Sequence, residues 1–410
     1  MEEDKSMQAD SPGHENRATR ERPEPFSSNA VRLSLAEWGF AYCIAAAVVW
    51  LVQTAWPHLE RFEPGRDYRI PYSLSNDYWH YARYARRAAQ EGDILVVGDS
   101  VVWGEYVSPG GTFTACLNEQ TDKTMGNDAQ AASYYGQNVQ ATSVSGTWFV
   151  NLGVNGIHPA ALAGLIDYYG RDIAGKRVVL HYNPLWMSSK RHDLQTEKEF
   201  RFNHPKLVPQ FTPAIPCYKE SYAVRLGVVI ERYLPVRNWA NHLAVAYFDN
   251  KPVVRWAVTH PYENPLRQIT LQLPAPGAGQ RHRDAPWYEK GISRQPFEWV
   301  MPADSLQWRL FKETVRTLED RDNELFVLVG PFNEHMIAEQ SLEDYQNIKT
   351  GIGQWLDGQG IPHHVFEALP SELYADASHP RREGYALLAK RLLELNAFED
   401  FCTTEPLQTM

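Results

Sequence analysis

A serine, a histidine and an aspartate that stand far apart in the sequence are the residue types that acyl transfer requires. Ser100 ends the tripeptide Gly98-Asp99-Ser100, and His379 follows Asp376 by three positions. In acyl transfer a serine hydroxyl attacks a carbonyl carbon, a histidine takes the hydroxyl proton, and a carboxylate orients that histidine. We therefore predict that Ser100 is the nucleophile, His379 the base and Asp376 the residue that orients His379. Because the base must be neutral, activity is expected to fall below about pH 6 to 7.

Two further positions offer donors for the oxyanion that forms during such a reaction. Gly156 follows an apolar run and can present a bare backbone N–H, and Asn183 ends another apolar run with a side-chain amide. Taken singly, Gly156 is an ordinary turn glycine, Asn183 a strand-ending turn residue, and Asp376-x-x-His379 a helix-capping turn. Suitable residue types at the ends of several strands, in one chain, favour the acyl-transfer interpretation.

The elements that must position these residues alternate between strand and helix. Short apolar runs predict strands over 93–98, 147–152, 177–183, 324–329 and 363–367. Helical spacing predicts helices over 76–91, 158–174, 304–321, 339–357 and 382–396, with Asp304 as the cap of the third. This alternation predicts a parallel sheet with helices on both faces, whose carboxyl edge carries the site. The turn at 330–335 is open to two interpretations, a wall of the site or an ordinary turn.

The stretch over about 188–300 interrupts this alternation and is rich in proline and aromatic residues. A structureless loop of that length is uncommon inside a compact domain. We expect an inserted subdomain or a lid between the third and fourth strands. Aromatic residues there fit a sugar-binding groove and a packed lid equally well.

The N-terminal part of the chain predicts a membrane anchor. Residues 1–34 are expected to form a disordered tail, 35–57 a transmembrane helix, 58–75 a linker, and 76–400 the catalytic domain. No charged residue lies between Trp38 and Trp56, and tryptophan at both ends suits the two bilayer interfaces. A cleaved signal peptide and a buried helix are the alternatives. Arginines flank both ends, with a slight excess before the segment that places the catalytic domain outside the cytoplasm.

Composition excludes several other classes of protein. The chain has 410 residues, 43% hydrophobic and 22% charged, as expected of a folded globular protein. Its net charge of −10 argues against nucleic-acid binding. The four cysteines and the histidines show no metal-ligand spacing, so no metal or cofactor is expected.

These motifs resemble the four blocks of the SGNH (GDSL-type) hydrolase superfamily. The matching residues are Gly98-Asp99-Ser100-x-x-x-Gly104, Asn151-Leu152-Gly153-Val154-x-Gly156, Asn183, and Asp376-x-x-His379-Pro380-x-x-x-Gly384-Tyr385. The resemblance covers roughly 90–185 and 304–396. Two departures are present: Val101 replaces a frequent leucine, and the third block reads His181-Tyr182-Asn183-Pro184 where the family usually has Gly-x-Asn-Asp.

The resemblance implies a three-layer α/β/α sandwich with a five-stranded parallel sheet, similar to the flavodoxin-like folds. It also implies a Ser100–His379–Asp376 triad, with the oxyanion held by the Ser100 and Gly156 amides and by Asn183. The leading hypothesis is a membrane-tethered serine esterase or deacylase that acts on an ester-bearing substrate. The alternatives are an O-acyltransferase for a cell-envelope polysaccharide and a catalytically silent envelope binding or assembly protein.

Overall fold

The computed structural model of the chain describes residues 33–65, 67–122, 147–198, 202–212, 214–277 and 285–403. The tail expected over 1–34 lies outside this part, apart from its last two residues. The chain divides into two units, Met1–Val52 and Gln53–Met410.

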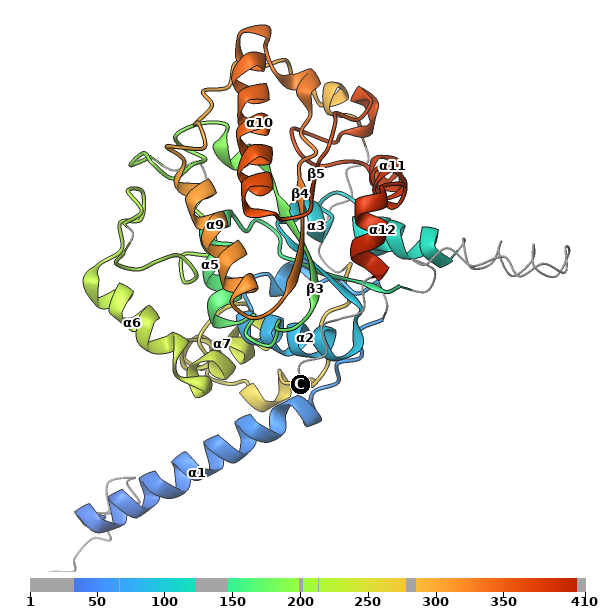
Figure 1. The fold of residues 1–410 in the computed structure, drawn as a ribbon. Coiled ribbons are helices and arrows are strands. Elements are labelled where there is room, and N and C mark those ends of the chain that lie inside the picture. Colours follow the sequence, from blue (N-terminus) through green and yellow to red (C-terminus); the bar gives the residue numbers. More distant parts are fainter. Residues whose placement is uncertain are drawn as a thin grey trace, which may run out of the picture. The chain divides into compact units, whose positions relative to one another are not determined.

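A five-stranded, all-parallel sheet forms the centre of the larger unit (Figure 1). The strands are β1 (Ile94–Gly98), β2 (Phe149–Gly153), β3 (Arg177–Tyr182), β4 (Glu324–Val329) and β5 (His363–Val365), in the spatial order β2-β1-β3-β4-β5. The α/β class, the five strands and their parallel direction are confirmed, and every strand boundary lies within two residues of the predicted one. The chain order reverses beside β1, so that the ends of β1, β2 and β3 lie next to each other.

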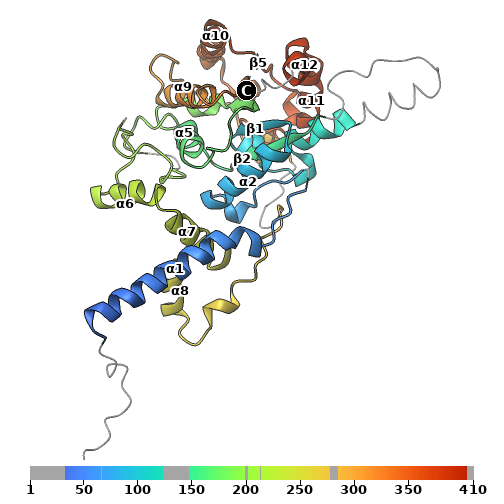
Figure 2. The same ribbon diagram turned by 60° about the horizontal axis from the view of Figure 1, so that its bottom comes forward.

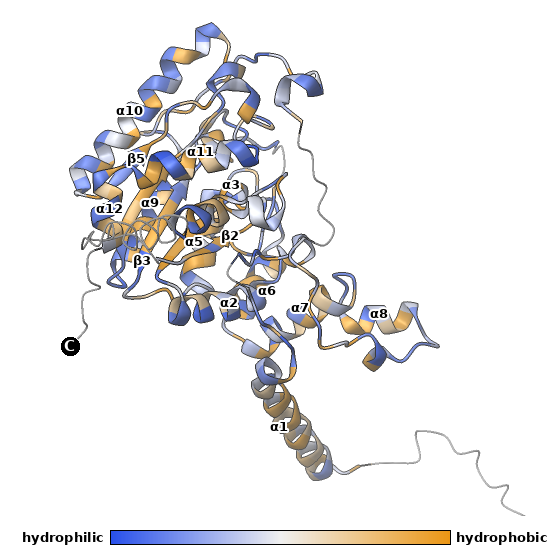
Figure 3. Cartoon of the chain, turned by 90° about the vertical axis from the view of Figure 1, so that its right-hand side faces the viewer, coloured by the Kyte–Doolittle hydropathy of each residue, from blue (hydrophilic) through white to orange (hydrophobic). Residues whose placement is uncertain are grey.

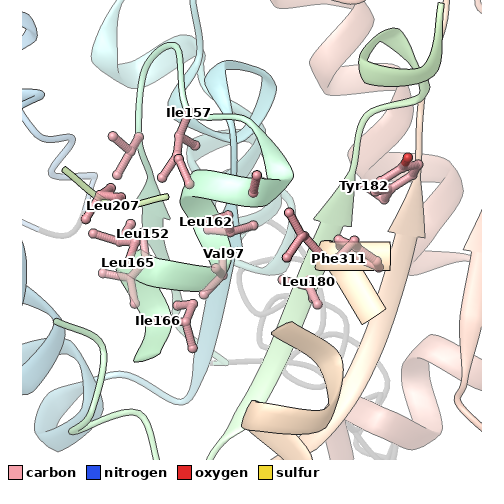
Figure 4. Packing of buried hydrophobic residues seen from close by; sticks show 14 of the residues in the cluster. Val97, Leu152, Ile157, Leu162, Leu165, Ile166, Leu180, Tyr182, Leu207 and Phe311 are labelled. Carbon is pink, nitrogen blue, oxygen red and sulfur yellow. The ribbon is translucent and has the colours of Figure 1, made fainter. Parts of the chain in front are cut away.

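Alternate residues of the strands enter two separate apolar clusters. Leu95 and Val97 pack with residues of α2 (Tyr78–Glu91), α5 (Pro159–Tyr168), α9 (Leu306–Glu319) and α10 (Leu342–Gln359). Ile94 and Val96 pack with α11 (Arg382–Leu393) and α12 (Asn396–Thr403). Figure 4 shows Val97, Leu152 and Leu180 of the strands pointing toward Leu162, Leu165 and Ile166 of α5 and Phe311 of α9. The two-residue period of buried strands accounts for this division.

Several helix boundaries differ from the predicted ones, and hydrogen bonds account for two of the differences. The cap of α9 is Ser305, whose Oγ accepts from the Trp308 amide at 3.0 Å, and not Asp304. Asp193 reinforces that helix start, because its carboxylate accepts from the Leu306 amide at 2.8 Å. Helix α5 ends at Tyr168, earlier than predicted. The Gly170 amide donates a hydrogen bond to the Leu165 carbonyl at 2.9 Å, which closes the end of the helix.

The segment between β3 and β4, residues 183–323 and called the β3–β4 segment below, contains helices before α9 begins. It contains α6 (Tyr222–Arg232), α7 (Pro235–Tyr247) and α8 (Val253–Thr259), together with the short turns η4 (Pro184–Met187), η5 (Pro265–Arg267) and η6 (Trp287–Lys290). Figures 1 and 2 both show α6 and α7 side by side. Leucines at positions 194 and 207 of this segment are buried in the main core.

Helix α1 (Leu35–Leu59) is long and apolar enough to cross a membrane, with a mean hydropathy of 1.8 over its most apolar stretch. Figure 3 shows the apolar character of this helix. Its last residues, from Gln53, belong to the larger unit, where Trp56 is buried. Residues 58–75, expected as a linker, also contribute buried side chains to that unit, Tyr68, Arg69, Ile70 and Leu74 among them.

Candidate active site

Ser100 is presented by the turn from β1 into α3 (Ser100–Trp103). Asp99 caps this short helix, because its Oδ1 accepts from the Val101 amide at 3.0 Å. The neighbouring strand ends in Gly153, and a Cβ there would lie 2.4 Å from the Trp103 nitrogen. Only glycine therefore lets α3 rest directly on the end of β2. The result is a serine at the carboxyl edge of the sheet, where parallel α/β proteins bind ligands.

The three residues predicted as a triad form one continuous hydrogen-bonded chain. Ser100 Oγ lies 2.8 Å from His379 Nε2. His379 Nδ1 lies 2.8 Å from Asp376 Oδ1 and 2.9 Å from its Oδ2. A carboxylate only accepts hydrogen bonds, so Nδ1 carries the ring proton and the lone pair of Nε2 faces the serine hydroxyl. Ser100 and His379 are each only 6% exposed.

The loop that carries Asp376 and His379 is folded back on itself. Asp376 Oδ1 accepts from the backbone amides of Ser378 at 3.0 Å and His379 at 2.9 Å. The Ala375 amide donates to the His379 carbonyl at 2.8 Å. The carboxylate and the imidazole are therefore fixed to each other by main-chain as well as side-chain bonds.

The turn at 330–335 supports this loop from the end of β4. The buried Asn333 donates from Nδ2 to the Asp376 carbonyl at 3.1 Å and from its backbone amide to the Ala377 carbonyl at 2.8 Å. This turn therefore positions the base indirectly. The sequence pattern contained no signal for that role, because it depends on a contact between segments far apart in the chain.

The buried Asp99 carboxylate is the centre of a second polar cluster beside Ser100. Its Oδ2 accepts from Asn183 Nδ2 at 2.8 Å and from Trp186 Nε1 at 3.1 Å. Its Oδ1 lies 3.3 Å from Nδ1 of His181, whose Nε2 donates to the Gly330 carbonyl at 2.7 Å. Burial acts to raise the pKa of Asp99, but His181 and the hydrogen-bond donors outweigh it and lower the pKa. Trp186 was not among the predicted site residues.

Asn183 thus donates one of its two side-chain amide hydrogens to Asp99. Its Oδ1 accepts from the Leu185 amide at 3.0 Å, which fixes the orientation of the side chain. Only the second hydrogen of Nδ2 is left for an oxyanion, so the predicted donor role of Asn183 stays a prediction.

Gly156 lies in the turn after β2 with a φ of +70°, a conformation that favours glycine. Two residues of the β3–β4 segment hold this turn: Asn203 Nδ2 donates to the Gly156 carbonyl at 3.2 Å, and His204 Nε2 donates to the Asn155 carbonyl at 3.0 Å. Within the described residues, the backbone amides of Gly156 and Ser100 have no acceptor in the chain. Both amides are therefore available to an acceptor from outside the chain.

A second carboxylate, not predicted, faces the base. Glu105 Oε2 lies 3.5 Å from His379 Nε2, and its side chain is 29% exposed. The next residue, Tyr106, places its ring edge against the imidazole at 5.4 Å between centroids. Lys290 of η6 lies over the Tyr106 ring and donates to the Ala375 carbonyl at 2.7 Å. The β3–β4 segment therefore contributes to the walls of the site.

The charges around His379 change its pH range. Burial would lower the pKa of the imidazole, but the Asp376 carboxylate, with Glu105 and Asp99, outweighs burial and raises the pKa to about 9. Burial likewise acts to raise the pKa of Asp376, and the His379 charge and hydrogen bonds outweigh it and lower the pKa to about 2. The imidazole therefore stays protonated to a higher pH than the range of 6 to 7 predicted from the sequence.

No family model matches the sequence, and no curated protein matches it. Assignment of a function therefore depends on the geometry of the site.

Proposed function

We propose that this chain is a membrane-tethered serine esterase or deacylase of the SGNH type, with its catalytic domain outside the cytoplasm. The observation that carries the proposal is the hydrogen-bonded chain from Ser100 through His379 to Asp376 at the carboxyl edge of the sheet. The parallel sheet with helices packed on alternate strand residues supports the SGNH fold, and the length and composition of α1 support the tether.

The proposed reaction has two half-reactions. In the first, Ser100 Oγ bonds to the carbonyl carbon of the ester while His379 Nε2 takes the hydroxyl proton. The tetrahedral intermediate collapses, the bond to the alcohol breaks, and His379 returns the proton to that alcohol. In the second, water attacks the acyl-Ser100 ester, His379 takes a proton from the water, and the Ser100 oxygen leaves and recovers that proton. The products are an alcohol and a carboxylic acid.

Three groups are proposed to stabilise this reaction. Asp376 keeps the proton on Nδ1 and balances the positive charge that His379 gains. The Ser100 and Gly156 amides donate to the oxyanion, and Asn183 supplies a third donor if its second amide hydrogen is directed there. Each such donor contributes on the order of 100- to 1000-fold in rate.

Transfer of the acyl group to a sugar hydroxyl is the second candidate, favoured by the position of Glu105. Its partly exposed carboxylate lies beside Nε2, where the second nucleophile must be deprotonated, and can accept a hydrogen bond from a neighbouring hydroxyl of a polysaccharide. An acceptor with two adjacent hydroxyls could then contact both His379 and Glu105.

Reaction of the full-length chain with a fluorophosphonate probe and a chromogenic acetate ester tests the proposal. We expect Ser100→Ala to abolish both labelling and hydrolysis. Ser378→Ala is the matched control, because Ser378 is a buried serine beside His379 whose hydroxyl has no hydrogen-bond partner among the described residues. Acetyl transfer that outruns hydrolysis when a polysaccharide is added would favour the second candidate. A native chain that neither reacts with the probe nor turns over the ester would refute both.

A further inference from the structure

Helix α8 and the residues after it expose a row of large apolar side chains. The row consists of Val254 (77% exposed), Val258 (74%), Tyr262 (100%) and Leu266 (73%), and it is called the α8 patch below. Val254 and Val258 stand one helical turn apart, on the side of α8 away from the buried Trp256, which packs against Phe248 and His260. Figure 3 shows apolar and polar residues along this helix. Four large apolar side chains exposed within thirteen residues of sequence are typical of a contact with another molecule or a membrane.

Both ends of the chain segment that carries the patch are attached to the carboxyl end of α1. Before the patch, Trp56 of α1 packs against Trp239 and Tyr247 of α7, with ring centroids 5.6 Å and 6.5 Å apart. After the patch, the Arg61 amide donates to the Leu271 carbonyl at 3.1 Å, and Arg61 pairs with Gln272. The α8 patch therefore belongs to a loop that leaves from, and returns to, the place where α1 enters the larger unit.

Buried ion pairs link the residue that follows α1 to α2 and α7 of the larger unit. Glu60, directly after α1, accepts from Arg83 at 2.6 Å and lies 2.8 Å from His242 of α7. Arg83 also donates to the Pro57 carbonyl at 2.7 Å. Within the larger unit, the last residues of α1 and the segment that carries the α8 patch are thus bound to each other.

The charge around the patch is opposite to that of the whole chain. Over 251–272 the three basic residues Lys251, Arg255 and Arg267, all exposed, face one acidic residue, Glu263, whereas the chain carries −10. Exposed apolar side chains on a segment with an excess of basic residues fit the interface of an anionic bilayer. A second copy of the chain would bring the same positive charges against these residues and is disfavoured.

We propose that the α8 patch inserts into the interfacial layer of an anionic membrane, as a second contact beside α1. Val254 and Val258 enter the boundary of headgroups and acyl chains to a depth of about 5–10 Å. Tyr262 lies at the headgroup level, and the three basic residues contact lipid phosphates. This inference assumes that α1 crosses the membrane. Two membrane contacts fix the orientation of the catalytic domain relative to the bilayer, whereas a single helical tether leaves the domain free to rotate.

Spin labels on the full chain in nanodiscs test this proposal. The discs contain phosphatidylcholine with one quarter phosphatidylglycerol, and collisions with oxygen, which dissolves in lipid, are compared with collisions with a water-soluble nickel chelate. The label is placed at Val258→Cys in a Cys43→Ser background, where the other three cysteines are buried. Gln354→Cys on α10 is the matched exposed helix position, and native Cys43 reports on α1 itself.

We expect the labels at 258 and 43 to favour oxygen, and the label at 354 to favour nickel. Changing Lys251, Arg255 and Arg267 together to Gln should move the label at 258 toward water in the anionic discs. A label at 258 that behaves like the one at 354, while Cys43 reports lipid, overturns the proposal and leaves the anchor intact. If Cys43 also reports water, the anchor and the proposal both fail. Spin–spin broadening at 258 that disappears on dilution with unlabelled chain would show a second copy on the patch and also overturn the proposal.

Discussion

Replacing Asp376 by Asn removes the charge beside His379 while keeping the shape of the loop. Asp376 Oδ1 accepts two backbone amides, at 3.0 Å and 2.9 Å, so the oxygen of the new amide is held in that place. Its NH₂ group must then occupy the Oδ2 position, 2.9 Å from His379 Nδ1. An N–H there donates to Nδ1 and drives the ring proton to Nε2. Nε2 then donates to Ser100 instead of accepting, and the base is lost.

The expected loss in kcat is about 10,000-fold, the size seen when a triad histidine is held in the wrong tautomer. At about 1.4 kcal/mol for each factor of ten, this loss corresponds to roughly 5 kcal/mol of transition-state stabilisation. A stability change should accompany it. The pKa of Asp376 is lowered from 3.8 to about 2, so the loss of its charge costs roughly 2 kcal/mol at neutral pH.

Steady-state hydrolysis of an acetate ester, with chemical denaturation beside it, measures both quantities. Ser100→Ala supplies the background rate. If Asp376→Asn retains kcat within a factor of ten of the native chain while Ser100→Ala is inactive, the tautomer argument is wrong and Asp376 does not orient the base. A variant that fails to unfold cooperatively would be replaced by Asp376→Glu, which keeps the charge and should recover part of the rate.

Four other results are expected. Since the pKa of His379 is raised to about 9, kcat/KM should fall tenfold for each pH unit below about 9; a profile that is flat between pH 6 and 9 contradicts this. The stability gained from protonated His379 should be complete below pH 6.5 and disappear as the pH rises through about 9, as denaturation across that range can show. Asn183→Ala should lower kcat/KM by on the order of 100- to 1000-fold, with Trp186→Phe as control because it removes another donor to the same Asp99 oxygen; an equal loss in both variants would show that Asn183 acts only through Asp99. Trp56→Ala should lower the free energy of unfolding by about 3 kcal/mol, whereas the exposed Trp50→Ala should change it by less than about 0.5 kcal/mol; equal effects would place Trp56 outside the core of the larger unit.

The sequence predicted the sheet well because parallel strands are buried on both faces. Residues 94–97 form an uninterrupted apolar run, and such a run has few other structures available in an α/β chain. The same regularity placed Ser100, Asn183 and Gly156 at strand ends, where their side chains or amides meet at one edge. The close spacing of Asp376 and His379 made their contact predictable from local geometry alone.

Other parts of the site depend on contacts that no local pattern records. Asn333 supports the Asp376 loop through a bond between segments that follow different strands, and Trp186 reaches Asp99 because η4 turns it back toward β1. The predicted cap of α9, Asp304, is one residue before the observed cap, Ser305. Aspartate and serine both cap helices, and Ser305 is the one that caps α9 and also donates a hydrogen bond to Asp193. The contact of Glu105 with His379 could not be predicted, because the two residues are far apart in the sequence and meet only in the folded chain.

Asp376 and His379 belong to one short turn, tied together through their own main chain, whereas Ser100 belongs to another part of the fold. A movement of that turn away from α3 would lengthen the Ser100–His379 distance and leave the His379–Asp376 pair intact. The pKa of His379 would then keep the contribution of Asp376 and lose those of Glu105 and Asp99, and the reactivity of the serine would report the docking of the turn. A population with the turn undocked would therefore keep the His379–Asp376 pair and be detected by its failure to react with a serine-directed probe.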